Sequence, residues 1–145
     1  MTSTDPFKPR ILLIEDETFI RQTIRRLLKT IGTPEIRESA DGTEALAILH
    51  SGFDPDIIFC DVQMTPMDGF TFLRTIRGDP NPGLAATPVI VLTASADLNV
   101  VRRFSGLGIS SYLLKPVSRQ QLTEHMTAAV RRAEATPPSR VGTEP

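Results

Sequence analysis

The sequence predicts an α/β fold, a five-stranded parallel sheet with helices on both of its faces. Short apolar runs alternate with helical patterns along the chain, which is typical of βαβ units joined by right-handed crossovers. Several of these runs are uninterrupted, as expected for strands buried on both sides. The length of 145 residues suits one domain.

The expected strands are five short runs bounded by turn residues. They cover residues 10–14, 35–39, 56–60, 88–92 and 110–114. The run 35–39 gives the weakest signal because most of its residues are polar.

Helices are expected where apolar residues recur at three- and four-residue spacing. Thr43 is the expected N-cap of the second helix, and Ser118 that of the last. The third helix is expected over residues 70–76 and the fourth over residues 97–107. The first ends at Gly32, and its expected apolar face comprises Phe19, Ile20, Ile24, Leu27, Leu28 and Ile31.

The remaining segments are expected to be irregular. Residues 79–87 contain prolines and a glycine and are expected to form a loop. Residues 1–8 are expected to be a flexible leader and residues 133–145 a disordered tail, which leaves residues 9–132 as the folded domain.

Composition narrows the class of protein. A net charge of −1 gives no reason to expect nucleic acid or a membrane surface as a partner. The single cysteine, Cys60, excludes an intramolecular disulfide and is interpreted as a small core residue. No apolar run has the length of a membrane span, and the N-terminus lacks the apolar core of a signal peptide. We therefore expect a cytoplasmic protein.

Hydrophilic residues follow the strongest strands at their carboxyl ends. Glu15 and Asp16 follow the first strand, Asp61 the third, Thr93 the fourth and Lys115 the fifth. Taken singly, each residue is equally well explained as a helix cap, a turn residue or a solvated charge. In a parallel sheet, however, these ends share one edge, which is where open α/β sheets bind ligands. Their convergence predicts one site.

Three carboxylates and one ammonium group at this edge leave an excess of negative charge. At a separation of ~4 Å and an effective dielectric constant near 20, each pair of like charges costs about 4 kcal/mol. Either one carboxylate is protonated or a cation neutralises them. Oxygen ligands at an open site favour Mg²⁺, and a carboxylate nucleophile beside Mg²⁺ and a lysine suits phosphoryl transfer.

Several motifs occur in order at these strand ends. They are Ile14-Glu15-Asp16-Glu17, Asp61-Val62-Gln63-Met64 with Met67-Asp68-Gly69, Val91-Leu92-Thr93-Ala94, Tyr112-Leu113-Leu114-Lys115-Pro116 and Asp41-Gly42-Thr43-Glu44-Ala45-Leu46. With these motifs, the segment from about Pro9 to Arg132 resembles the receiver domains of bacterial two-component response regulators, of the single-domain chemotaxis type. The resemblance implies the flavodoxin-like, doubly wound (βα)5 receiver fold.

The resemblance also implies a role for each residue of the site. Asp61 would accept a phosphoryl group from a phosphohistidine and bind Mg²⁺ together with Asp16, while Glu15 would bind the ion through water. The backbone carbonyl of Gln63 would be a further ligand. Lys115 would pair with the phosphoryl group, and its peptide bond to Pro116 would be cis.

Signal output is implied as well. Thr93 would move toward the phosphoryl oxygen and Tyr112 would turn inward with it, which would remodel the face built from the fourth helix, the fifth strand and the fifth helix. Gln63 and Ser95 occupy the two positions that tune phosphoryl lifetime. The implied partners are a sensor histidine kinase or histidine phosphotransfer protein and a downstream protein. A homodimer through the fourth and fifth helices is left open.

One departure from the family pattern lies close to Asp61. Thr65 stands where the family usually has proline, and Pro66 follows it. We therefore expect this loop, and with it the carbonyl of Gln63, to be the part of the site where the family pattern is least reliable.

Two other functions were weighed against a signalling switch without conventional enzyme activity. A phosphatase of the haloacid dehalogenase type would need a second acid two residues after the nucleophile, where this chain has Gln63. A flavodoxin-like cofactor binder would need a phosphate-binding loop after the first strand, where Glu15, Asp16 and Glu17 would repel a phosphate.

Overall fold

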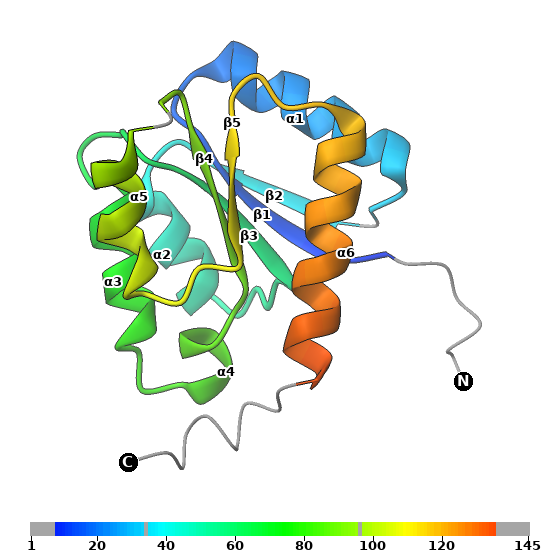
Figure 1. The fold of residues 1–145 in the computed structure, drawn as a ribbon. Helices are drawn as coiled ribbons and strands as arrows, with labels where there is room; N and C mark the ends of the chain where they lie inside the picture. Colours follow the sequence, from blue (N-terminus) through cyan, green and yellow to red (C-terminus); the bar gives the residue numbers. More distant parts are fainter. Residues whose placement is uncertain (1–7, 34, 96, 136–145) are drawn as a thin grey trace, which may run out of the picture.

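A parallel sheet of five strands forms the centre of the molecule (Figure 1). In this computed structural model, residues 8–33, 35–95 and 97–135 are described. The strands are β1 (Arg10–Ile14), β2 (Glu35–Ser39), β3 (Ile57–Asp61), β4 (Val89–Thr93) and β5 (Ser111–Leu114). Their order is β2-β1-β3-β4-β5, and every neighbouring pair is parallel. The predicted fold class is therefore confirmed.

Helices cover both faces of this sheet (Figure 1). They are α1 (Thr18–Ile31), α2 (Gly42–His50), α3 (Gly69–Arg77), α4 (Pro82–Ala85), α5 (Leu98–Ser105) and α6 (Arg119–Ala135). Within the described ranges, none of them is long and apolar enough to cross a membrane.

Two hydrophobic cores lie on opposite faces because side chains alternate along each strand. On one face, Leu12 and Ile58 pack with the side chains of α2, α3 and α5. On the other, Ile11 and Phe59 pack with α1 and α6. Each such buried side chain contributes roughly 1.5–3 kcal/mol. Cys60 is buried in the first core, as expected for a small apolar residue.

Three local expectations were wrong. The loop expected over residues 79–87 contains the helix α4, a single turn capped by Asn81 that is too short to show helical periodicity. Asp41, not Thr43, is the N-cap of α2, because its carboxylate accepts the N–H groups of Thr43 and Glu44. Phe19, assigned to the apolar face of α1, is 78% exposed because, at 3.6 residues per turn, it lies on the opposite side of the helix from the buried Leu28.

Other boundaries agree closely with the expected ones. The left-handed conformation of Gly32 ends α1 as expected, with φ of 101°. Ser118 precedes α6, and its Oγ accepts the N–H of Gln121, as expected of an N-cap. The helix α6 extends to Ala135, beyond the boundary expected at Arg132. The leader up to Phe7 and the tail from residue 136 onward lie outside the described residues.

Candidate functional site

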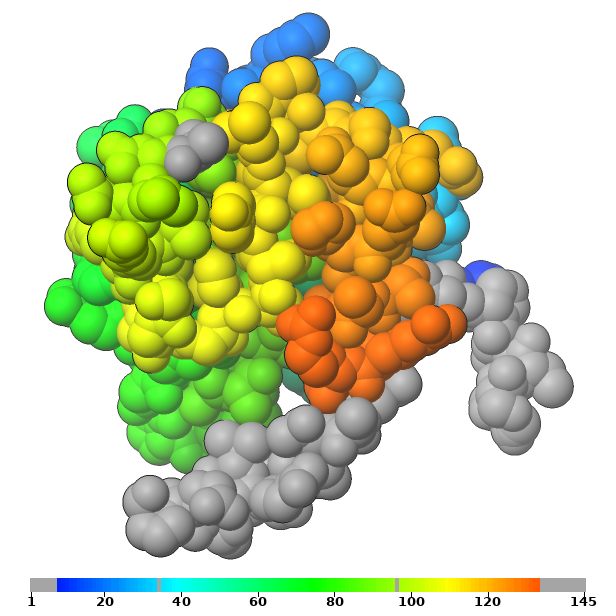
Figure 2. All heavy atoms as spheres, in the orientation of Figure 1, coloured from blue at the N-terminus to red at the C-terminus, as the bar shows by residue number. Residues whose placement is uncertain are grey.

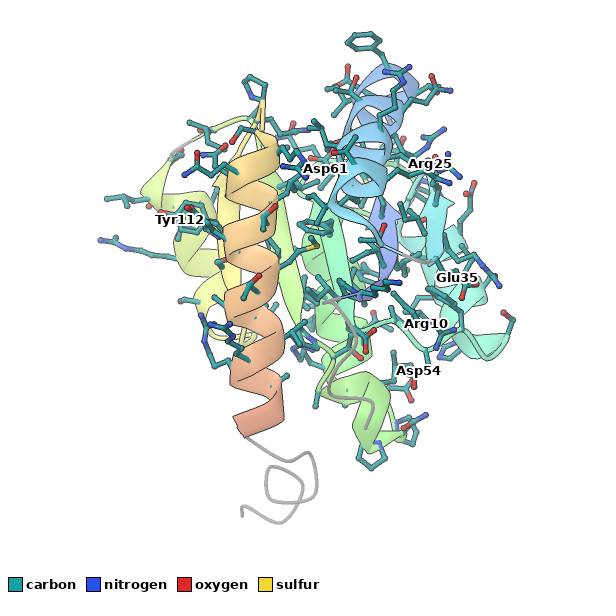
Figure 3. The ribbon with its side chains drawn as sticks, turned by 90° about the vertical axis from the view of Figure 1, so that its right-hand side faces the viewer. Arg10, Arg25, Glu35, Asp54, Asp61 and Tyr112 are labelled. Carbon is teal, nitrogen blue, oxygen red and sulfur yellow. The ribbon has the colours of Figure 1, made fainter. Side chains whose placement is uncertain are left out.

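The carboxyl ends of β1, β3, β4 and β5 meet at one edge of the sheet, where a cleft of about 580 Å³ opens. Figure 3 shows Asp61 near this edge, toward the opposite end of the sheet from Arg10 and Asp54. Six of the residues expected at the site line the cleft. They are Asp16, Asp61, Gln63, Thr93, Ser95 and Lys115.

Asp61 is the last residue of β3 and is 5% exposed. Its Oδ1 accepts hydrogen bonds from Lys115 Nζ at 3.1 Å and from the Val62 N–H at 2.9 Å. The same Nζ donates to Glu15 Oε1 at 3.0 Å, and Glu15 is fully buried. Lys115 thus bridges two carboxylates. Among the described residues, Asp61 Oδ2 accepts no hydrogen bond, so this oxygen is available for chemistry.

Close backbone packing fixes the position of Asp61. The helix α3 begins at Gly69, whose N–H donates to the carbonyl of Val62 at 2.9 Å. A Cβ at Gly69 would collide with the backbone carbonyl oxygen of Asp61. Glycine is therefore required here because the start of α3 passes directly against the end of β3.

The donor set fits a hard divalent cation. One carboxylate oxygen from each of Glu15, Asp16 and Asp61 lies within 4.8 Å of the others. Asp16 is exposed at the mouth of the cleft, whereas the other two carboxylates are buried. Lys115 balances only part of this negative charge. Oxygen donors in an open, acidic cleft are the ligands that Mg²⁺ prefers, so these residues fit that ion.

The pKa values reflect this charge imbalance. Burial, together with the nearby charge of Asp61, raises the pKa of Glu15 to about 7, although Lys115 opposes the shift. Burial acts to lower the pKa of Lys115, but its hydrogen bonds to Glu15 and Asp61 prevail and raise that pKa overall. The ammonium group is therefore held charged between its two carboxylate partners.

Thr93 and Tyr112 are the two residues for which an inward movement is expected. Thr93 Oγ1 donates to the carbonyl of Ser95 at 3.0 Å and accepts the N–H of Ser95 at 3.1 Å, so the hydroxyl is engaged with the loop that follows β4. Tyr112 of β5 is 43% exposed. It lies on the face formed by α5, β5 and α6, which Figure 2 shows as one continuous surface.

Gln63 and Ser95 are both exposed at the cleft, on the loops that follow β3 and β4. The peptide bonds Thr65–Pro66 and Lys115–Pro116 are both cis, the second of which the resemblance implied. Two hydrogen bonds with the N-terminus of α2 hold the loop that has the unusual Thr65-Pro66 order. Met67 donates its N–H to Asp41 Oδ2, and its carbonyl accepts the N–H of Gly42.

Sequence reasoning missed two residues that support the site. Asp41 ties the loop after Asp61 to the N-terminus of α2. Arg21 of α1 donates from Nη1 to the carbonyl of Glu15 at 2.8 Å. An acid directly before a helical glycine was a local signal for Asp41. No local signal distinguished Arg21 from its neighbour Arg25.

The comparison with known proteins agrees with this geometry. The sequence model of the response regulator receiver domain matches residues 11–127, and the chain therefore belongs to that family. It is thus a signalling module of two-component systems rather than a conventional enzyme. Its acidic cluster resembles the phosphorylation and magnesium site of such domains.

Among curated relatives, the chain is 33% identical to the chemotaxis protein CheY of Pseudomonas aeruginosa, over 85% of this chain and 97% of that protein. It is also 34% identical to the Regulator of RpoS of Escherichia coli, over 74% of this chain but only 30% of that longer protein. The chain therefore spans nearly the whole of one relative and a minor part of the other.

Among solved structures, the chain resembles the receiver domain of the sensor histidine kinase PA1611 of Pseudomonas aeruginosa, which has a magnesium ion coordinated in its active-site cleft. The TM-score is 0.76 with 27% identity, covering 86% of this chain and 99% of that one. The chemotaxis protein CheY4 of Vibrio cholerae gives a TM-score of 0.76 with 28% identity, covering 85% and 99%.

Proposed function

We propose that this protein accepts a phosphoryl group on Asp61 from a sensor histidine kinase or a histidine phosphotransfer protein in the cytoplasm, and that phosphorylation changes its affinity for a downstream protein. The observation that carries the proposal is the pairing of Asp61 with Lys115 inside a cluster of three carboxylates. A buried carboxylate beside a cation and a metal-binding acid group is suited to attack on phosphorus.

The transfer forms an Oδ–P bond and breaks the P–N bond of the phosphohistidine. The electron pair of that bond returns to the imidazole nitrogen, which takes up a proton. Asp61 Oδ2 is the suited nucleophile because Oδ1 already accepts two hydrogen bonds. Lys115 Nζ, which contacts the Asp61 carboxylate before the transfer, would then contact the phosphoryl oxygens.

Mg²⁺ would be held by Asp16, Asp61 and the carbonyl of Gln63, and through water by Glu15. When bound, it neutralises the charge on the transferring phosphoryl group. Gln63 and Ser95 are exposed and line the cleft, which supports assigning both to the control of phosphoryl lifetime. The Thr93 hydroxyl would give up its hydrogen bonds with Ser95 and donate to the phosphoryl group instead. Tyr112 would then move inward.

A protein donor must contact the rim of the cleft in order to bring its phosphohistidine to Asp61. At this rim, an apolar groove of about 340 Å³ is lined by Phe19, Ile20, Pro116 and Val117 together with Lys115. Phe19 is 78% exposed there. An exposed phenylalanine beside the cleft supports docking of an apolar helix face from the donor. The output partner is assigned to the surface of α5, β5 and α6 in Figure 2, where Leu98, Tyr112 and Leu114 are exposed.

The first test is phosphorylation by a small donor. Wild-type protein incubated with Mg²⁺ and acetyl phosphate should gain the mass of one labile phosphoryl group. Asp61→Asn, which keeps the size of the side chain, should gain none. Intact-mass measurement decides the matter, and an unchanged wild-type mass, or equal labelling of the variant, would refute the proposal.

A second test separates donor docking from chemistry. Phe19→Ala should slow transfer from a phosphorylated histidine kinase by about tenfold, the effect of losing one exposed aromatic anchor. Its rate with acetyl phosphate should remain unchanged, because Phe19 is not among the residues that line the cleft around Asp61. Equal slowing with both donors would contradict a docking role for this groove.

A further inference from the structure

Arg21 connects the helix α1 to the peptide group that precedes Asp16. Its side chain is 18% exposed and makes two directed contacts. Nη1 donates to the carbonyl oxygen of Glu15 at 2.8 Å, and Nε donates to Glu38 Oε1 of β2 at 3.1 Å. The guanidinium is therefore anchored on an edge strand and directed at the backbone of the site.

The backbone of Glu15 is held on both sides. Its N–H donates to the carbonyl of Ser39 at 3.0 Å, which continues the β1–β2 ladder, and its carbonyl accepts Arg21. The carbonyl of Glu15 and the N–H of Asp16 belong to one planar peptide group, so a contact that fixes the first orients the second.

Asp16 depends on this backbone contact. Its side chain is exposed, and among the described residues its carboxylate accepts no hydrogen bond. Nothing in that part of the chain holds the carboxylate in place except the peptide from which it projects. By contrast, Glu15 and Asp61 are held through Lys115.

We infer that Arg21 is a positioning residue of the metal site, which acts by orienting the Glu15–Asp16 peptide so that the Asp16 carboxylate faces the other two acids. This inference rests on the proposed function, since it concerns the same Mg²⁺ site. Groups that orient metal ligands without touching the metal typically change affinity by about 10–100-fold when they are removed.

Electrostatics alone predicts the opposite sign. The positive charge of Arg21 lies against the backbone carbonyl of Glu15 and would repel Mg²⁺ at the site, so removing the charge without any positioning effect would strengthen binding. The direction of the change in Mg²⁺ affinity therefore distinguishes a positioning residue from a nearby charge.

Arg25 provides a matched control, because it lies one turn further along α1 and shares the partner Glu38 (Figure 3 labels Arg25 beside this helix). Its Nε is 2.7 Å from Glu38 Oε2, but the N–H is not directed at that oxygen, so the contact is an ion pair rather than a hydrogen bond. Among the described residues, Arg25 makes no hydrogen bond to Glu15.

The experiment compares Arg21→Met and Arg25→Met in the full chain by calorimetric titration with Mg²⁺, together with the thermal midpoint of each protein. Arg21→Met should bind Mg²⁺ about tenfold more weakly than wild type. Arg25→Met, which removes the same charge from the same helix, should bind within about twofold of wild type or slightly more tightly.

Each result has one meaning. Arg21→Met binding as tightly as wild type, or more tightly, would overturn the inference, and so would equal weakening in both variants. If wild-type protein binds Mg²⁺ and becomes phosphorylated, those results leave the proposed function standing. If wild type binds no Mg²⁺ at all, the proposed metal site fails and the role of Arg21 fails with it.

Discussion

Two largely buried cations lie at opposite edges of the sheet and have opposite surroundings. Lys115, at the carboxyl edge, contacts the carboxylates of Glu15 and Asp61. Among the described residues, Arg77, near the amino edge, donates only to backbone carbonyls, which are those of Ala85, Thr87, Leu107 and Gly108. Burial lowers the pKa of Arg77 to about 10, whereas the carboxylates raise that of Lys115.

The difference between the surroundings of Lys115 and Arg77 shows which edge of the sheet is suited to chemistry. The hydrogen bonds of Arg77 hold α4 and the turn before β5 against the end of α3, so its charge serves the fold. Lys115 faces more carboxylate than it can neutralise, and its contacts can be exchanged for a metal ion or a phosphoryl group. We therefore assign a structural role to the charge of Arg77, which is bonded to backbone dipoles, and propose a functional role for that of Lys115, which is bonded to titratable partners.

The largest expected effect is on stability at the amino edge. Arg77→Met should lower the free energy of unfolding by about 3 kcal/mol, because it removes the donor from three partly buried carbonyls at once. Urea unfolding measures this change, and Mg²⁺ affinity should stay within about twofold of wild type.

Arg74 is the control for this variant, since it lies on the same helix and its guanidinium carbon is 5.5 Å from the centre of the Phe70 ring. Within the described part of the chain, it makes no hydrogen bond to a backbone carbonyl. Arg74→Met should cost less than about 1 kcal/mol. Equal losses of unfolding free energy in the two variants would show that the hydrogen bonds of Arg77 do not stabilise the fold. The contrast between the two edges of the sheet would then disappear.

A smaller effect of a different kind is expected at the carboxyl edge. Lys115→Met removes the cation that competes for Glu15 and Asp61, so Mg²⁺ should bind about tenfold more tightly. Phosphorylation by acetyl phosphate should nevertheless slow, because the phosphoryl oxygens lose their ammonium partner. Weaker Mg²⁺ binding in this variant would mean that Lys115 organises the carboxylates rather than competing for them.

The smallest expected effect concerns Asp41, a carboxylate that stabilises the fold at the carboxyl edge of the sheet. Burial opposes ionisation of Asp41, but hydrogen bonds from the N–H groups of Thr43, Glu44 and Met67 lower its pKa below the ordinary 3.8. A lowered pKa stabilises the folded protein above pH 3.8, and this stability is lost as the pH falls through the folded-state value.

Asp41→Asn keeps a capping oxygen but cannot ionise, so it should cost about 1 kcal/mol at neutral pH. Urea unfolding at several pH values should show the difference from wild type shrinking as the pH falls below 3.8. If the difference in unfolding free energy stays constant across this pH range, Asp41 contributes through the size and hydrogen bonding of its side chain rather than through its charge.

The sequence predicted the sheet edge well because parallel topology places strand ends together. Asp61, Thr93 and Lys115 could be assigned to one site from the position of each residue after an apolar run. Phe19 was assigned wrongly, since its position in the helical period lies opposite the buried Leu28 and therefore outside the apolar face of α1. The helix α4 was missed because a single turn has no periodicity to detect.

The sequence by itself determined the alternation of the five strands with the five longer helices, most of the apolar faces and the identity of the acids, because these depend on local periodicity and on chain topology. Only the tertiary structure decided which charges touch. Lys115 reaches Glu15 across 100 positions of the chain, and Arg21 rather than Arg25 reaches the Glu15 carbonyl. Such contacts depend on how α1 and β5 pack against β1, at a precision of one helical turn that no sequence pattern specifies.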